Sequence, residues 1–163
     1  MLKLCGFVKH WLPVLGWMAV IYSASADRKS AQHSSRLIEP LLHWLFPHLP
    51  HDTVWLIVLL IRKGAHLTEY AILALLLWWA WRASAAPGAR AWSWRWAWKI
   101  WLVVVLYAVS DELHQKFVPD RQASGWDVLI DSLGAAAGLV GLWAVGCWRK
   151  WWVGGDSNPG PMP

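Results

Sequence analysis

Long stretches without a charged side chain recur along this chain, and they constrain its fold more strongly than any other feature. Such runs cover residues 10–26, 100–110 and 132–148. Hydrophobic residues make up 57% of the 163 residues and charged residues only 15%, whereas roughly 25% charged residues is usual in a soluble domain. Recurring apolar runs are typical of helices that cross a membrane, which need about 20 residues each. The sequence therefore predicts an all-α integral membrane protein.

We expect one domain, residues 1–152, that forms a bundle of about four transmembrane helices plus a short interfacial helix. The predicted transmembrane helices cover about residues 10–26, 63–81, 98–117 and 126–148. Residues 35–46 carry apolar side chains at helical spacing up to Pro47, which predicts the interfacial helix. Residues 54–61 are apolar but too short to span, so they either re-enter the membrane or extend the next helix outward. Residues 153–163 are predicted to form a disordered tail.

The first apolar run has two interpretations. A basic start, an apolar stretch and the small residues Ala24-Ser25-Ala26 together resemble a signal peptide with its cleavage site. We favour a retained first helix. Cleavage would remove this helix but would leave the polar stretches described below on the same side of the membrane.

The unpaired basic residues predict the orientation of the bundle. Arg82, Arg90, Arg95 and Lys99 lie in or beside the middle loop without acidic neighbours, and further Lys and Arg residues lie near both termini. Cytoplasmic loops are enriched in Lys and Arg. We therefore expect both termini and the middle loop in the cytoplasm.

Tryptophan is abundant, with 17 residues, and most of them border the predicted cytoplasmic side, interleaved with Arg and Lys. Indole rings settle at the headgroup level of a bilayer and basic residues attract anionic lipids, so membrane anchoring explains both. Aromatic residues also stack on nucleic-acid bases. Beside transmembrane helices, however, we expect membrane lipids as partners and no nucleic acid.

Two polar patches interrupt the apolar pattern, at residues 62–70 and 111–131. If the helices alternate across a bilayer, both patches meet at the extracytoplasmic face. Charged residues within or beside a transmembrane segment are costly and usually face the bundle interior, where they mark a functional site. In the first patch, Arg62, His66 and Glu69 are four and three residues apart, so they share one helix face.

The second patch continues into a stripe of Asp127, Asp131, Gly134 and Gly138, at intervals of four, three and four residues. The two glycines make a GxxxG pattern, which lets a neighbouring helix approach closely. A tight reversal at residues 119–125, which include Pro and Gly, would place the third and fourth transmembrane helices side by side. The pattern therefore predicts a close pair of helices capped by carboxylates.

Three hypotheses for the polar patches remain open. In the first, carboxylates and imidazoles bind a divalent cation such as zinc, manganese or magnesium. In the second, histidine and carboxylates act as acid and base while arginines hold an anionic headgroup. In the third, carboxylates and basic residues neutralise each other as a structural network that closes the end of the bundle. The candidate catalytic residues are His66, Glu69, Asp111, Glu112 and His114, the candidate substrate-binding residues are Arg62, Tyr70, Gln115 and Arg121, and the candidate metal ligands are Asp127 and Asp131 with Glu69 and Asp111.

The order of these polar motifs resembles the VanZ-like family. The resemblance rests on Arg62-Lys63-x-x-His66-x-x-Glu69-Tyr70, then Asp111-Glu112-x-His114-Gln115-x-x-x-Pro119-x-Arg121, then Asp127-x-x-x-Asp131-x-x-Gly134. Ile21-Tyr22-Ser23-x-Ser25 is similar to the family's N-terminal pattern, and the likeness covers residues 10–148. Asp120 departs from the pattern, which commonly has a small residue there. The resemblance implies a small multi-pass protein of the bacterial cytoplasmic (inner) membrane, linked through its family to resistance to the glycopeptide teicoplanin.

These observations lead to one functional hypothesis and two alternatives. The leading hypothesis is an extracytoplasmic polar pocket that handles the headgroup of an envelope lipid or a lipid-linked envelope precursor, with a divalent metal as the candidate cofactor. If the protein is an enzyme, transfer or hydrolysis at a phosphate or acyl centre is the fitting reaction class. The first alternative is a non-enzymatic envelope factor whose ion network only stabilises the bundle. The second is a small proton-coupled carrier.

Overall fold

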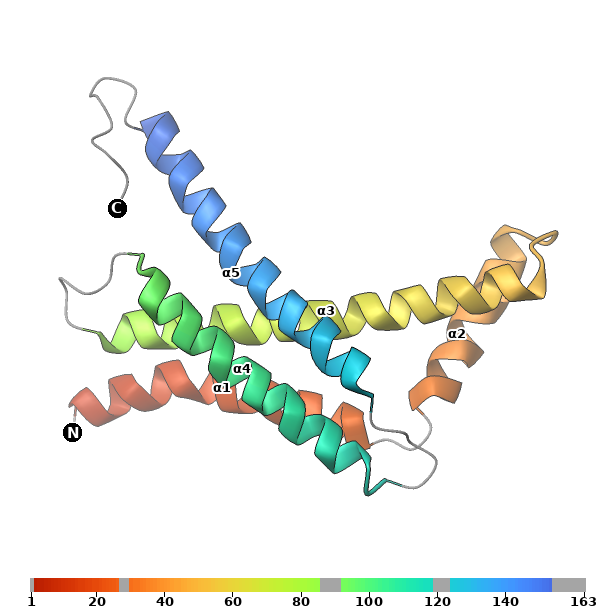
Figure 1. Ribbon diagram of the computed structural model, residues 1–163, viewed down its shortest axis with the longest axis horizontal. Helices are drawn as coiled ribbons and strands as arrows, with labels where there is room; N and C mark the ends of the chain where they lie inside the picture. The colour runs from red at the N-terminus through yellow and green to blue at the C-terminus, as the bar shows by residue number, and fades with distance from the viewer. Residues whose placement is uncertain (1, 27–29, 86–91, 119–123, 154–163) are drawn as a thin grey trace.

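The computed structural model of the chain describes residues 2–26, 30–85, 92–118 and 124–153. These residues form five α-helices: α1 (Leu2–Ala26), α2 (Ser30–Leu45), α3 (His51–Ser84), α4 (Trp94–Gln115) and α5 (Gly125–Val153) (Figure 1). All regular structure in this part of the chain is helical, which confirms the all-α prediction. Val153, predicted to start the tail, ends α5, and residues 154–163 lie outside the described residues.

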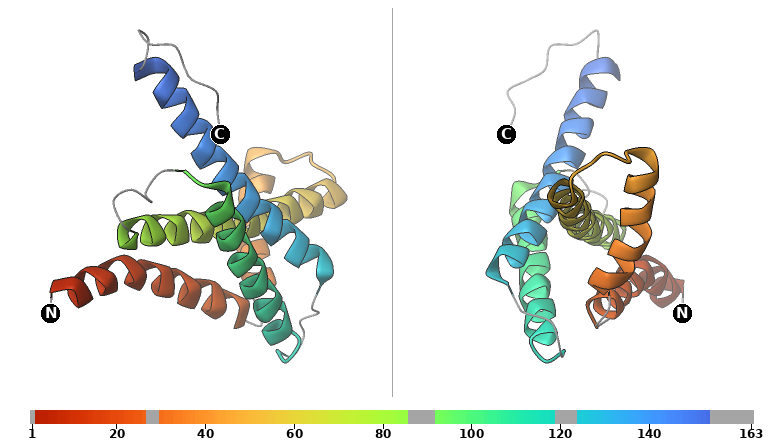
Figure 2. Two further views of the ribbon diagram at one scale, coloured as in Figure 1. Left: turned by 60° about the vertical axis from the view of Figure 1, so that its left-hand side comes forward. Right: turned by 90° about the vertical axis from the view of Figure 1, so that its right-hand side faces the viewer.

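The central helix of the bundle is α3. It contacts each of the other four helices, and its most extensive contact is with α5. Helices α1 and α4 lie along the part of α3 nearer its C-terminus, whereas α2 lies across the opposite end (Figures 1 and 2). The C-terminal part of α5 extends away from the other helices (Figure 1). The bundle therefore consists of α1, α3, α4 and α5, with α2 attached to one end of α3.

The core lies between α3 and the three helices around it. Tyr70, Leu73, Ala74 and Leu77 are buried at spacings of three and four residues, so one face of α3 points into the core. They pack with buried residues of α1, α4 and α5, namely Val14, Ile21, Val104, Ala108, Ala135 and Leu139. Several of these side chains are small, which lets helix backbones approach closely enough for van der Waals packing to stabilise the contacts.

Gly134 and Gly138 of α5 bring this helix into backbone contact with α3. A Cβ atom at Gly134 would overlap the carbonyl oxygen of Leu67, and one at Gly138 would lie 2.9 Å from the carbonyl oxygen of Ala71. The close helix approach predicted from the GxxxG pattern is therefore confirmed. The sequence predicted that α5 would pair closely with α4. The glycines of α5 instead face α3, although α4 also contacts α5. The pattern marks a close approach without specifying which helix fills the space.

The start of α3 at His51 decides between the two alternatives for residues 54–61, which extend the helix outward and do not re-enter separately. With 34 residues, α3 is about 51 Å long at about 1.5 Å per residue. The hydrocarbon core of a bilayer is only about 30 Å thick, so α3 is longer than a membrane crossing requires. Helix α2 packs against this extra length and covers most of the predicted interfacial helix at residues 35–46.

Tryptophan side chains gather where the C-terminal end of α3 meets the start of α4. The ring centroids of Trp78 and Trp92 are 4.4 Å apart, and those of Trp81 and Trp96 are 4.8 Å apart. The ammonium group of Lys99 lies 4.3 Å from the centre of the Trp96 ring, a cation–π contact. This tryptophan cluster (Trp78, Trp81, Trp92 and Trp96) combines aromatic and basic side chains as residues at a membrane interface do.

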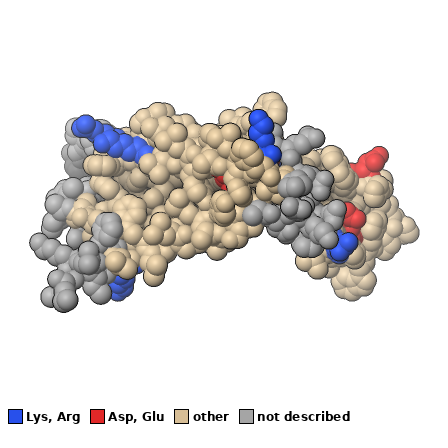
Figure 3. All heavy atoms as spheres, turned by 90° about the horizontal axis from the view of Figure 1, so that it is seen from below, with Lys and Arg blue, Asp and Glu red and all other residues tan. Residues whose placement is uncertain are grey.

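Within the described residues, Gly125–Trp148 of α5 is the one stretch long and apolar enough to cross a membrane by length and composition. The predicted crossings by α1, α3 and α4 stay predictions. Leu12, Leu15, Val103 and Leu106 on α1 and α4 are exposed. On the face shown in Figure 3, a broad surface without charged side chains, apart from a small acidic spot, separates the basic residues at the left end from the other charged residues. Such extended apolar surfaces suit contact with a membrane.

Candidate functional site

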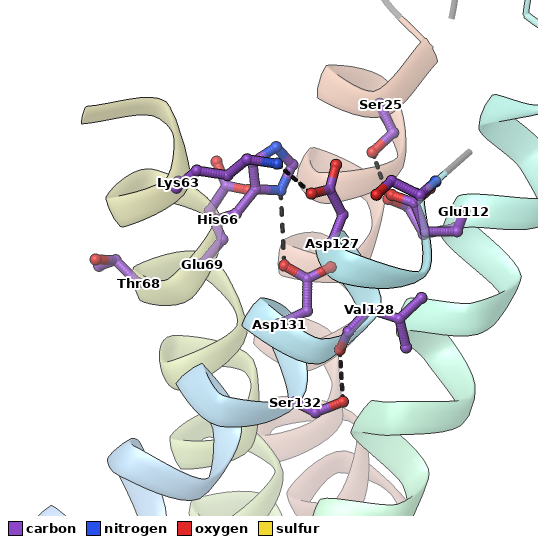
Figure 4. Close-up of polar contacts among 12 residues, drawn as sticks. Ser25, Lys63, His66, Thr68, Glu69, Glu112, Asp127, Val128, Asp131 and Ser132 are labelled. Carbon is purple, nitrogen blue, oxygen red and sulfur yellow. Dashed lines mark hydrogen bonds and ion pairs between the residues drawn. The ribbon is translucent and has the colours of Figure 1, made fainter. Parts of the chain in front are cut away.

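Four helices bring polar side chains together beside the middle of α3 (Figure 4). Helices α1 and α4 end there, α5 begins there, and α3 passes by. We call the group formed by the following residues the polar cluster: Ser25, Lys63, His66, Glu69, Tyr70, Asp111, Glu112, Gln115, Asp127 and Asp131. The two polar patches of the sequence therefore meet in space.

Asp111 links α1 to α4. Only 3% of its surface is exposed, and its Oδ2 accepts hydrogen bonds from Ser25 Oγ at 2.6 Å and from Gln115 Nε2 at 3.1 Å. Gln115 lies one helical turn after Asp111 on the same face of α4, as the spacing predicts. Among the described residues, Oδ1 of Asp111 has no hydrogen-bond partner. One oxygen of this carboxylate thus links α4 to α1, and the other has no hydrogen-bond partner among the described residues.

Glu112 and Asp127 stabilise the connection between α4 and α5. Glu112 is buried, and its Oε2 accepts a hydrogen bond of 2.8 Å from the backbone N–H of Ser124, just before α5 begins. Asp127, in the first turn of α5, forms an ion pair with Lys63 of α3. Both side chains of this pair are partly exposed, so water screens the attraction. These two carboxylates behave as the structural hypothesis predicts.

Asp131 is the most deeply buried of the described carboxylates, with 1% of its surface exposed. Its Oδ1 lies 3.7 Å from Nδ1 of His66, which makes an ion pair if the imidazole is protonated. This oxygen has no hydrogen-bond partner within the described part of the chain. Asp131 lies less than one turn before Gly134, where α5 touches the backbone of α3. The tight helix contact therefore places an incompletely satisfied carboxylate in the interior.

Tyr70 brings a second open group to the interior. Its side chain is completely buried on the core face of α3, and its hydroxyl has no hydrogen-bond partner among the described residues. The hydroxyl lies within electrostatic range of the carboxylates of Asp111 and Asp131. By contrast, the nearby Tyr107 hydroxyl donates a hydrogen bond of 2.7 Å to the backbone carbonyl of Met18. Most buried polar groups are hydrogen-bonded as Tyr107 is, so Tyr70 is the exception.

Two of the described candidate site residues, His114 and Arg62, stand apart from these contacts. His114 stacks on Tyr22 with a centroid distance of 4.3 Å, and its Nδ1 lies 3.3 Å from the Tyr22 hydroxyl. Arg62 is partly buried one turn before His66 and forms no ion pair with another described residue. Arg121 lies outside the described residues. The side chain of Glu69 is partly buried beside His66 (Figure 4) and within electrostatic range of Asp111.

Sequence reasoning missed Ser25 and Trp17 as members of the site. Ser25 donates the shortest hydrogen bond to Asp111, and Trp17 Nε1 donates a hydrogen bond of 2.9 Å to the backbone carbonyl of Glu69. Both residues come from α1, so the first helix completes the site. The available signal was the Ile21-Tyr22-Ser23-x-Ser25 pattern, in which Ser25 closes an otherwise apolar run.

The divalent metal predicted as a cofactor stays a prediction. Among the described residues, no group of three or more His, Cys, Asp or Glu side chains could hold a metal ion. Of the predicted ligands, Asp127 pairs with Lys63, and Asp111 is held by Ser25 and Gln115. The acidic side chains of the polar cluster come from three helices, α3, α4 and α5.

A family model described as VanZ/LLP1 matches residues 10–146, which include every member of the polar cluster. No curated protein and no solved structure matches the chain. The matched region extends from α1 to α5. The family resemblance indicated by the polar motifs is therefore confirmed.

Proposed function

Because the chain belongs to the VanZ/LLP1 family of membrane proteins, which is linked to glycopeptide resistance, we propose that it binds the headgroup of an envelope lipid or of a lipid-linked envelope precursor. The binding site is the inner part of the polar cluster, around Asp131, Asp111 and Tyr70, and excludes the partly exposed Lys63–Asp127 ion pair. Its members lie where three helices end or begin beside the middle of α3, so an amphiphile could present its headgroup there and keep its chains in the bilayer.

This proposal rests on Asp131, a buried carboxylate whose Oδ1 has no hydrogen-bond partner among the described residues. A buried charge costs several kcal/mol unless a partner and hydrogen bonds compensate for it. In a purely structural network each buried carboxylate should have such partners, as Glu112 and one oxygen of Asp111 do. Oδ1 of Asp131 has no hydrogen bond from a described residue. An intramembrane carboxylate in this state is best explained by a ligand.

The positions of the basic residues support an extracytoplasmic site. Lys9, Arg82, Arg95 and Lys99 lie near the N-terminus of α1, the C-terminus of α3 and the N-terminus of α4. These ends gather at the opposite end of the bundle from the polar cluster (Figure 1). The positive-inside rule assigns the basic end to the cytoplasm, so we place the protein in the cytoplasmic membrane with both termini inside.

His66 and Asp131 are the pair best suited to chemistry on a bound headgroup. A histidine oriented by a carboxylate can accept a proton from an attacking group and return it to a leaving group. Their separation of 3.7 Å tightens readily into a hydrogen bond once a substrate is bound. The fitting reaction class is transfer or hydrolysis at a phosphate or acyl centre.

A structural role is the second candidate function, and it is favoured by Lys63–Asp127 and by the hydrogen bond from Ser124 to Glu112. In this case the polar cluster closes the bundle, and the protein acts in the envelope through another surface. The two candidate functions predict different effects of replacing Asp131.

The test compares Asp131→Asn with Asp127→Asn in protein purified in a mild detergent. We expect the wild type to retain a distinct lipid class, measured by mass spectrometry of co-purified lipid. Asp131→Asn should lose that class without a lower melting temperature. Asp127→Asn should retain the lipid and melt slightly earlier, because a partly exposed ion pair contributes only about 0–1 kcal/mol. Unchanged lipid with early melting of Asp131→Asn would establish the structural role instead.

A further inference from the structure

Three buried oxygen atoms in the polar cluster lack hydrogen-bond partners among the described residues: Oδ1 of Asp131, Oδ1 of Asp111 and the hydroxyl of Tyr70. The three side chains are 1%, 3% and 0% exposed. Buried polar atoms in this state are rare in native proteins. Their gathering in one cluster, on three different helices, indicates that a bound group completes their hydrogen bonds.

The charges around these three atoms indicate the sign of the charge on the bound group. The polar cluster contains five carboxylates, on Glu69, Asp111, Glu112, Asp127 and Asp131, and they lie within electrostatic range of one another. Two described basic side chains contact them: Lys63, which is paired with Asp127, and His66, whose Nδ1 lies 3.7 Å from Oδ1 of Asp131. An anionic group without a balancing cation would be repelled from this interior. The group that fits is a cation.

The oxygen atoms without hydrogen-bond partners also indicate which kind of cation fits. A divalent metal needs several ligands converging on one point, and the described His, Cys, Asp and Glu residues form no such group. A primary ammonium group instead carries three N–H donors, which can bond to two carboxylates and a neutral hydroxyl oxygen. The lysine ammonium of Lys63 already contacts a carboxylate, Asp127, one turn along α5 from Asp131. The cluster thus accommodates an ammonium–carboxylate contact at its outer edge.

We infer that the inner part of the polar cluster takes the primary ammonium group of an aminated lipid headgroup, with Asp131 as counter-ion and Tyr70 and Asp111 as further acceptors. This inference rests on the proposed headgroup binding and names its substrate class. In a zwitterionic lipid the phosphate lies a few bonds from the amine. Arg62, one helical turn before His66 along α3, provides a guanidinium for that phosphate.

The experiment measures the binding of three dioleoyl lipids to purified protein in detergent. Phosphatidylethanolamine carries a primary ammonium, phosphatidylcholine carries the same charge without N–H donors, and phosphatidylglycerol has the phosphate without an amine. We expect phosphatidylethanolamine to bind about tenfold more tightly than either, the factor given by one hydrogen bond to a charged group. Equal or tighter binding of phosphatidylglycerol would overturn the inference but leave headgroup binding standing. If none of the three lipids binds, both proposals fail.

Free ethanolamine distinguishes a lipid from a soluble amine as the source of the ammonium. We expect it to bind far more weakly than phosphatidylethanolamine. If it binds as tightly as the lipid, the ammonium site stands but lipid headgroup binding does not.

Two tyrosine variants provide a matched pair. Tyr70→Phe removes a hydroxyl without an internal partner, so the melting temperature should not fall, whereas phosphatidylethanolamine affinity should drop about fivefold. Tyr107→Phe removes the hydroxyl bound to the Met18 carbonyl, so it should melt earlier and keep the lipid preference. Asp131→Asn should reduce the preference to about twofold or less. A preference that survives both Asp131→Asn and Tyr70→Phe would contradict the assigned site.

Discussion

Asp111 and Glu112 are neighbours in the sequence but contact different parts of the bundle. Successive residues of an α-helix point about 100° apart, so Asp111 reaches Ser25 of α1 while Glu112 reaches the backbone at Ser124. Each carboxylate is therefore partly satisfied by a different segment. Ser25 is as important to this arrangement as the acids, because its hydroxyl is the only described donor from α1 to the cluster's carboxylates.

Replacing Ser25 with Ala should destabilise the fold. The variant removes a buried hydrogen bond of 2.6 Å to a carboxylate, and a hydrogen bond to a charged group contributes about 1.5–3 kcal/mol. Ser23→Ala is the matched control, because Ser23 is exposed and bonds only to the carbonyl of Ala19 in its own helix. Its effect should stay within about 0.5 kcal/mol. Unfolding followed by tryptophan fluorescence measures both, and equal effects would contradict the role of Ser25.

Sequence patterns identified the polar residues but not all of their directions. The spacing of Asp111 and Gln115 predicted their contact correctly, since residues four apart share a helix face. His114 was expected to join the acids, yet it stacks on Tyr22. That contact depends on how α1 lies against α4, which no pattern within either helix contains.

At the scale of helices, the contact between α3 and α5 depends on the absence of side chains at two positions. Gly134→Ala should destabilise the protein by about 1–3 kcal/mol or more, because the new methyl group would meet the Leu67 carbonyl. Gly141 lies further along the same helix, and its Cβ position is open. Gly141→Ala should therefore be neutral or stabilise by about 0.5–1 kcal/mol. Thermal melting in detergent measures the difference, and similar melting of both variants would show that α5 does not rest on α3.

The existence of the helices was predictable, whereas their ends and partners were only partly so. Charge-free runs and helical spacing predicted α4 and α5 close to their observed positions, whereas α1 and α2 begin at Leu2 and Ser30, well before the predicted starts at residues 10 and 35. For α3, the apolar residues 54–61 suited two arrangements, and only the structure shows that the helix continues through Arg62 and Lys63. The charged pair looks like a helix boundary in the sequence. It can lie mid-helix because Lys63 has a partner on α5.

At the scale of the whole molecule, orientation in the membrane can be tested from either side. His48→Cys lies in the turn between α2 and α3, and Ser84→Cys lies at the end of α3, each introduced with Cys5 and Cys147 replaced by Ser. We expect a membrane-impermeant maleimide to label His48→Cys on intact cells and to label Ser84→Cys only after permeabilisation. The reverse pattern would put the polar cluster on the cytoplasmic side and exclude an envelope-facing site.

Helix α3 carries residues of both the polar cluster and the tryptophan cluster. Between Lys63 and Trp81 this helix rises about 27 Å at about 1.5 Å per residue, close to the thickness of a hydrocarbon core, about 30 Å. If α3 crosses the membrane as the sequence predicts, indoles anchored at one leaflet would fix how deep the carboxylates sit in the other, because a helix cannot stretch. In that topology, a thicker bilayer would submerge Asp131 among acyl chains, and a thinner one would lift it to the glycerol level. The length of the membrane's fatty acids would then determine the environment of the carboxylates.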